Sequence, residues 1–182
     1  TGNNVKNQWN EAEAAACGDD PLAMRVYSSR LIGREAALVL HGGGNTSVKA
    51  PFTDIFGEVS EVLFVKGSGW DLATIEGPGF APVRLEVLKK MAQLSALSDP
   101  DMVSAQRAAL LDAGAPNPSV EAILHAIIPF RYVDHSHADA VVTVSNTPEG
   151  ETAIRSIYGD RVLVVPYVMP GFDLARAIWR MT

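Results

Sequence analysis

The chain has 182 residues, of which 47% are hydrophobic and 20% are charged, a balance typical of one globular domain. The formal net charge of −6 excludes a function based on broad contact with nucleic acid or an anionic membrane, because both need a basic face. The single cysteine, Cys17, excludes an internal disulfide framework, and the sequence shows neither a signal segment nor an apolar stretch of about 20 residues, so we expect a soluble cytoplasmic protein.

Local signals predict one helix and then several short strands in the first third of the chain. The helix should start after Asp20, whose side chain can cap free N–H groups, and end at Gly33. Residues 37–40 are predicted to form a short buried strand. Residues 46–49 and 62–66 have the pattern of further strands.

The middle of the chain has the pattern of helices. Apolar positions recur at helical spacing over residues 83–97, and a second short helix should start at Pro100. Asn117 is a suitable cap for a helix with Pro118 at its first position. We expect that helix to run to about Ile128.

The last third of the chain has a mixed pattern. Residues 131–137 are expected to form a strand, whereas 138–146 are ambiguous because their valines favour a strand by propensity alone. Residues 149–159 should be helical, residues 161–166 should form a strand, and a helix should begin within 171–180.

His135 and His137 are two residues apart, so on an extended backbone both imidazoles point to one face. There they can bind one divalent metal ion such as zinc, for which neutral imidazole is a good ligand. The alternative is that both are half-exposed polar residues at the end of a strand.

Glu121 stands near the start of the helix that leads into this strand, where its carboxylate can reach a ligand held by the metal. The alternative is a carboxylate that only stabilises the helix dipole. His125, four residues later on the same helix face, fits a hydrogen-bonded core histidine better than a metal ligand. His41, before a glycine turn, is expected to be structural.

Two glycine-rich turns, residues 42–47 and 66–69, offer free backbone N–H groups, hydroxyls and close approach, which an anion such as phosphate requires. Neither turn is a complete dinucleotide fingerprint or a P-loop. Ser119, in the first turn of the predicted helix, is a third candidate donor. Each segment alone is equally consistent with a simple turn.

Four short motifs occur in a characteristic order: G-N-T-S at 44–47, K-G-S-G at 66–69, P-S-V-E at 118–121 and H-S-H at 135–137. In order and spacing they resemble the class II aldolase and adducin family. The resemblance covers roughly residues 25–180, and it is strongest to the aldolase portion of two-part proteins that combine rhamnulose-1-phosphate aldolase with a short-chain alcohol dehydrogenase.

The resemblance implies a three-layer α/β/α sandwich with a largely antiparallel central sheet, and a homotetramer with sites at subunit contacts. It implies an N-terminal helical extension over 1–24 and an aldolase-type domain over 25–182, incomplete at its C-terminus. It also makes residues 138–146 helical. By resemblance, zinc or another divalent metal is bound by His135 and His137, Glu121 is the catalytic acid/base, and the substrate phosphate is bound by Gly44, Asn45, Ser68, Gly69 and Ser119.

This sequence departs from the family pattern at two points. Val120 stands where a phosphate-binding aldolase often has a second serine, which removes one expected donor. The third metal histidine of the family follows the helix that begins at Gly171, so it is expected beyond Thr182.

The function implied is that of a carbon–carbon lyase that cleaves a small ketose phosphate through a zinc-stabilised enediolate. As a general base, Glu121 is expected to have a pKa raised by partial burial. The alternatives are a sugar-phosphate epimerase or dehydratase on the same fold, or a non-catalytic adducin-like assembly module. The whole protein can also carry a short-chain dehydrogenase domain, although this segment shows no nicotinamide site.

Overall fold

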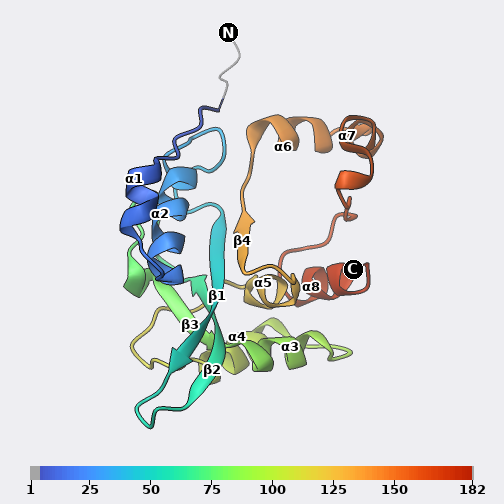
Figure 1. Cartoon of the computed structure of the whole chain (residues 1–182). Helices are drawn as coiled ribbons and strands as arrows, with labels where there is room; N and C mark the ends of the chain where they lie inside the picture. The colour runs from blue at the N-terminus through green and yellow to red at the C-terminus, as the bar shows by residue number, and fades with distance from the viewer. Residues whose placement is uncertain (1–4, 182) are drawn as a thin grey trace.

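The computed structural model describes residues 5–181 as an α/β structure built on one antiparallel sheet (Figure 1). The strands are β1 (Asn45–Thr53), β2 (Val59–Lys66), β3 (Phe80–Arg84) and β4 (Tyr132–His135). Their order across the sheet is β3-β2-β1-β4, and each neighbouring pair is antiparallel. The predicted antiparallel sheet is therefore confirmed.

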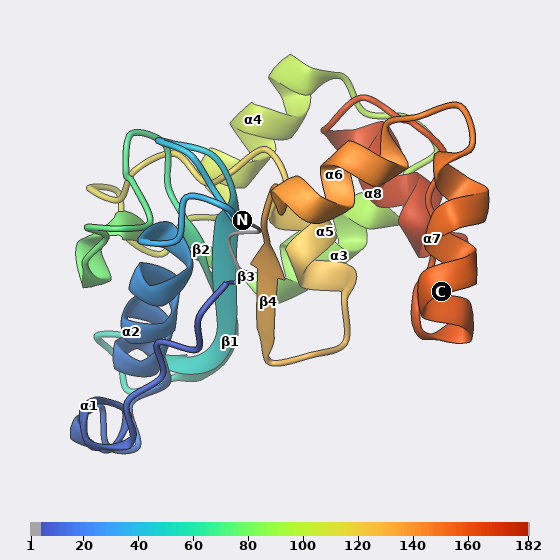
Figure 2. The same ribbon diagram turned by 90° about the horizontal axis from the view of Figure 1, so that it is seen from above.

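Helices cover both faces of this sheet, and the view from above shows three layers (Figure 2). One face carries α1 (Glu11–Ala16) and α2 (Pro21–Gly33). The other face carries α3 (Leu85–Ala92), α5 (Ala122–Ile127) and α8 (Phe172–Trp179). The remaining helices are α4 (Asp99–Ala108), α6 (Asp139–Ser145) and α7 (Gly150–Tyr158), with short 3-10 turns η1 (Gly77–Gly79) and η2 (Gly159–Arg161). This is the α/β/α arrangement that the sequence predicts.

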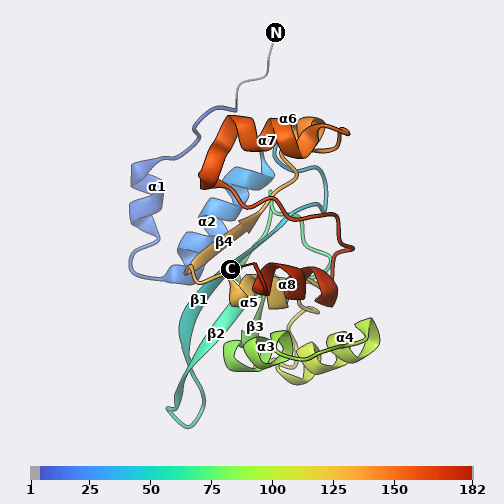
Figure 3. The same ribbon diagram turned by 90° about the vertical axis from the view of Figure 1, so that its right-hand side faces the viewer.

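The main core lies between the sheet and the layer of α3, α5 and α8 (Figure 3). Leu63 and Val65 of β2 are fully buried against Leu88 of α3 and Ile123 of α5. Burying an aliphatic side chain of this size contributes about 1.5–3 kcal/mol, so this core fixes α5 firmly on the sheet. The position of α5 matters because Glu121 directly precedes it.

A buried arginine fixes the opposite layer. Arg25 of α2 is 1% exposed, and its Nη1 atom lies 2.7 Å from Oδ1 of Asp134 on β4. The same guanidinium donates to the hydroxyls of Ser28 and Ser29 and to the carbonyl oxygen of Ser47. One side chain thus connects α2 to both β1 and β4.

Several predicted elements are confirmed. Asp20 caps α2 by accepting a hydrogen bond from the backbone N–H of Leu22, and α2 ends at Gly33. Residues 138–146 contain α6 despite their valines, and none of the α6 residues is buried. The helices predicted within 149–159 and 171–180 are α7 and α8.

Three predictions are wrong. Residues 37–40 form turns instead of a strand, because the N–H groups of Leu38 and Val39 donate back to the Glu35 carbonyl. Residues 162–166 have no regular structure and pair with no strand among residues 5–181. Residues 83–97 are only partly helical, because β3 takes up residues 83 and 84.

The predicted helix start at Pro118 is also wrong. Pro118 forms an isolated β-bridge with Gly67, and the N–H of Ser119 donates to the Lys66 carbonyl. Because these backbone groups extend the end of β2, α5 begins only at Ala122. Ser119 therefore precedes the helix and does not lie in its first turn.

Candidate active site

The predicted site residues meet at one end of the sheet. The start of β1, the turn after β2, the segment before α5 and the end of β4 enclose a hollow of about 460 Å³. All eight predicted site residues line this hollow: Gly44, Asn45, Ser68, Gly69, Ser119, Glu121, His135 and His137. The fold brings together residues that are up to 93 positions apart in the sequence, from Gly44 to His137.

Glu121 is the centre of the polar contacts in this hollow. Its side chain is 8% exposed, and its Oε2 atom accepts a hydrogen bond of 2.5 Å from Nδ2 of Asn45. The same oxygen lies 2.7 Å from Nδ1 of His135. The carboxylate is therefore directed at two side chains across the sheet end, which is more than a dipole-stabilising residue requires.

The pKa of Glu121 is shifted in the opposite direction to the expected one. Burial of the carboxyl group acts to raise its pKa, but the contacts with His135 and Asn45 favour the charged form and prevail, which lowers the pKa to about 2. The expected rise is thus wrong for the protein without metal. In that state Glu121 is ionised at neutral pH and can accept a proton.

The two histidines lie side by side. His135 is opposite Asn45 in the register of β1 and β4, and its ring centroid is 4.8 Å from that of His137. Although β4 ends at His135, the N–H of His137 donates to the Leu38 carbonyl, which holds the next residues in place. The expected proximity of the two imidazoles therefore results from β4 and from the turn after α2 together.

The hollow contains side chains of the types that bind a divalent metal. Nδ1 of His135 is buried, and its partner is the Glu121 carboxylate oxygen at 2.7 Å. The neighbouring imidazole of His137 is a second side chain of the type that binds a divalent metal. Within residues 5–181, however, no group of three potential metal-binding side chains is complete. The described residues therefore bring two imidazoles and one carboxylate together without forming such a group.

Glycine is required at the turn before β1. Gly44 has a φ of +69°, and a Cβ atom there would lie 2.7 Å from the carbonyl oxygen of His135. Gly69, in the second turn, has a φ of +86°. The hydroxyl of Ser119 accepts hydrogen bonds of 3.2 Å from Asn45 Nδ2 and from the N–H of Glu121.

The two other histidines, His41 and His125, do not line the hollow. His125 is 1% exposed and contacts Asn45 and Ser47 through its two ring nitrogens, so it is a hydrogen-bonded core residue. His41 is exposed, has a φ of +50°, and does not line the hollow.

Sequence reasoning missed the contact of Asn45 with both His125 and Glu121. Strand spacing could have indicated that Asn45, Ser47 and Lys49 lie on one face, because they occupy every second position along β1. In the structure this face is directed at α5. Lys49 Nζ donates to the carbonyl oxygens of His125, Ile128 and Phe130, which caps the end of α5. The polar face of β1 thus holds α5 along its whole length.

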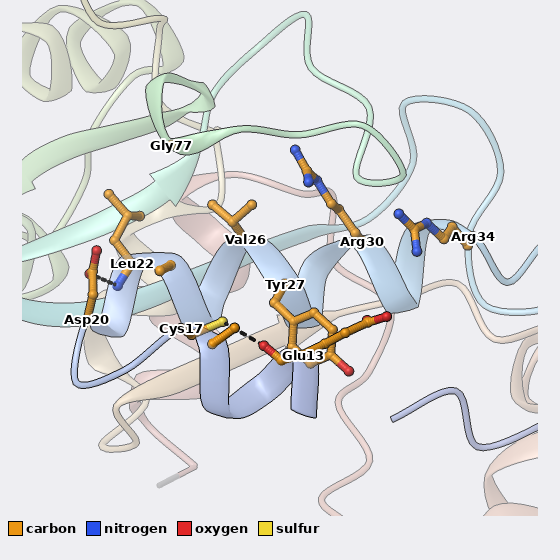
Figure 4. Close-up of a pocket in the computed structure, with 11 residues that line it drawn as sticks. Glu13, Cys17, Asp20, Leu22, Val26, Tyr27, Arg30, Arg34 and Gly77 are labelled. Atoms are coloured by element: carbon orange, nitrogen blue, oxygen red, sulfur yellow. Dashed lines mark hydrogen bonds between the residues drawn. The ribbon is translucent and has the colours of Figure 1, made fainter. Parts of the chain in front are cut away.

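A larger hollow of about 670 Å³ lies elsewhere, between α1, α2 and η1 (Figure 4). Tyr27, Arg30 and Cys17 line it, and the thiol of Cys17 donates a hydrogen bond to the Glu13 carbonyl oxygen. It contains none of the histidines or of the eight predicted site residues. Its size alone does not make it the active site.

The fold and the hollow around Glu121 define an α/β domain that presents a buried carboxylate and two imidazoles beside glycine-rich turns. Residues 25–181 match the family model described as Class II Aldolase and Adducin N-terminal domain. The chain belongs to the class II aldolase and adducin family, as its motifs predict.

Two known proteins support this assignment. The chain is 40% identical to a solved structure titled "Structure of the N-terminal Class II Aldolase domain of a conserved protein from Thermoplasma acidophilum". That match has a TM-score of 0.88 and covers 97% of this chain and 80% of the other. The chain is also 38% identical over 174 residues to "Uncharacterized oxidoreductase YuxG" of Bacillus subtilis (strain 168). This match covers 96% of the chain but only 25% of the length of that relative.

No helix in residues 5–181 is long and apolar enough to cross a membrane.

Proposed function

We propose that this chain is the catalytic domain of a metal-dependent aldolase that cleaves a small ketose phosphate similar to rhamnulose 1-phosphate. The observation that carries this proposal is the buried Glu121 carboxylate, held by Asn45 and directed at His135. Membership of the aldolase and adducin family supports this reaction class, and the glycine-rich turns suit a phosphate.

His135 and His137 are the residues that would hold a zinc ion, and within residues 5–181 no third side chain completes the set. Such a metal supplies Lewis-acid polarisation of the substrate's carbonyl and hydroxyl oxygens.

The remaining chemistry falls to the chain's own residues. Backbone N–H groups and hydroxyls at Gly44, Ser68, Gly69 and Ser119 would bind the phosphate group of the substrate. When the carbon–carbon bond breaks, the substrate hydroxyl gives its proton to the Glu121 carboxylate, and the carbon that carries this hydroxyl becomes the aldehyde carbon. The bonding electrons stay on the ketose-phosphate fragment as an enediolate, and Glu121 returns a proton to its carbon. Positioned proton transfer of this kind typically contributes about 10²–10⁴-fold to the rate.

The experiment is to incubate the intact protein and zinc with candidate ketose phosphates and to measure the aldehyde released. Glu121→Gln should lose about 10²–10⁴-fold in turnover, while zinc content and the melting temperature remain close to those of the wild type. Unchanged turnover in this variant would refute the assignment of Glu121.

The alternatives give different results in the same assay. An epimerase yields an isomeric sugar phosphate and a dehydratase yields a dehydrated one, in each case without aldehyde. An adducin-like module binds no zinc and converts none of the substrates. The family match includes adducin, but an assembly module has no need of the Glu121 and His135 contact.

The whole protein is proposed to be a cytoplasmic homotetramer, possessing a dehydrogenase domain beside the aldolase domain. The oxidoreductase name of the Bacillus relative, of which this chain spans a quarter, supports the second domain. The mass of the intact protein and a test for nicotinamide-dependent alcohol oxidation would check both points.

A further inference from the structure

His125 is buried behind the proposed site, between β1 and α5, and does not line the hollow. Both of its ring nitrogens have a partner. Nδ1 lies 2.7 Å from the hydroxyl oxygen of Ser47, and Nε2 lies 2.5 Å from Oδ1 of Asn45. The ring thus touches the same amide that holds Glu121, but at the opposite atom.

The direction of each hydrogen bond can be assigned from Glu121 outward. The amide atom that faces Oε2 of Glu121 is Nδ2 of Asn45, which can only donate a hydrogen bond. The acceptor Oδ1 then faces His125, which requires a proton on Nε2 of the ring. A neutral ring protonated at Nε2 has a bare Nδ1, which accepts the hydroxyl proton of Ser47.

The neutral ring that this arrangement requires agrees with the burial of His125. Burial lowers the pKa of the imidazole to about 4, and Glu121 only partly opposes this effect. The three hydrogen bonds then all donate in one direction, from Ser47 to His125, from His125 to Asn45 and from Asn45 to Glu121. With Nε2 unprotonated, Asn45 Oδ1 would face a lone pair, and the amide would lose its preference for one orientation.

We propose that His125 is a positioning residue, which fixes the Asn45 amide so that Nδ2 always points at Glu121. The proposal rests on the proposed function, since the part of Glu121 in the reaction is itself proposed. His125 touches no substrate and acts only through Asn45. The competing explanation is that the ring only fills space in the core.

Two substitutions separate these explanations. In His125→Gln, the side-chain amide nitrogen can take the place of Nε2 and still donate to Asn45. In His125→Asn, the shorter amide reaches the place of Nδ1, so a contact with Ser47 can remain while the donor to Asn45 is lost. Leu88→Ala is the matched control for a general loss of stability, because Leu88 is buried in the core away from the hollow.

The first measurement needs neither metal nor activity. In metal-free intact protein with ¹⁵N-labelled histidines, solid-state NMR distinguishes protonated from bare ring nitrogens, and the signals absent from His125→Gln belong to His125. We expect Nε2 protonated and Nδ1 bare at pH 7. The opposite tautomer, or a doubly protonated ring, would overturn the proposal.

The second measurement is the turnover of the ketose phosphate that the wild type cleaves. Misplacement of a reacting group by about 1 Å can cost about 100-fold in rate, so kcat of His125→Asn should fall by about that factor with little change in KM. His125→Gln should stay within about tenfold of the wild type. Leu88→Ala should keep its kcat at temperatures where it is folded.

Equal losses of kcat in the Gln and Asn variants, in proportion to their melting temperatures, would show that the ring only fills space. If the wild type cleaves no ketose phosphate, the proposed function fails, whereas the tautomer measurement still decides whether His125 orients Asn45.

Discussion

Acid should destabilise the metal-free protein through His125. The folded-state pKa of this ring is about 4 because the ring is buried, whereas the ordinary value is 6.5. Between these two pH values the unfolded chain holds a proton at His125 that the folded chain does not. The free energy of unfolding therefore falls as the pH falls from about 7 to about 4.

The size of this effect follows from the two pKa values. One pH unit of difference between folded and unfolded pKa corresponds to 1.36 kcal/mol, so the contribution of His125 approaches about 3 kcal/mol across the window. That is a large fraction of the total stability of a typical domain, which is about 5–15 kcal/mol. The full stabilisation is present above pH 6.5 and is lost towards pH 4.

The assay is urea unfolding of the metal-free protein at several values between pH 7 and pH 4. His125→Gln should show a weaker pH dependence than the wild type, so that the advantage of the wild type shrinks as the solution is acidified. Leu88→Ala, which removes no titratable group, should keep the wild-type pH dependence. A constant difference between wild type and His125→Gln, or one that grows towards acid, would refute the reasoning.

Three further outcomes are expected. Arg25→Met should lower the free energy of unfolding by about 1–3 kcal/mol in urea titrations, because it removes the buried donor to the Ser47 carbonyl oxygen and the link from α2 to two strands. Gly33→Ala should cost about 2 kcal/mol or more, since its Cβ would lie 2.1 Å from a backbone nitrogen, whereas Gly77→Ala, with open space around it, should be neutral by the same measure. Zinc at about 100 times its dissociation constant should stabilise the intact protein by about 2.7 kcal/mol in thermal scans, and EDTA or His135→Ala should abolish this gain.

The elements predicted well are those whose signals are local. Asp20 and Gly33 mark the two ends of α2 through groups that contact their own neighbours in the chain. Residues 161–166 illustrate the opposite case. Their valines favour a strand, but a strand requires a partner, and none is available within the described residues. The helix start predicted at Asn117 and Pro118 is wrong for another reason, because their backbone groups extend the end of β2.

The site was predictable as a set of residues but not as a set of contacts. The motif order identified eight of the residues that line the hollow. It did not indicate that Asn45 contacts both Glu121 and His125, or that these contacts lower the pKa of the carboxyl group. Alternation along β1 indicates that Asn45, Ser47 and Lys49 share one face of the strand, but it does not indicate that α5 packs against that face.

The alternation along β1 has a consequence for how the protein tolerates change. Asn45, Ser47 and Lys49 contact α5, whereas Thr46 and Val48 are the neighbours that point to the other face. A shift of one residue in the register of β1 would turn Thr46 and Val48 towards α5. The amide beside Glu121, the hydroxyl beside His125 and the ammonium cap of α5 would then all be lost at once. Site and fold would fail together, so the register of β1 should be as strictly limited as the identity of its residues.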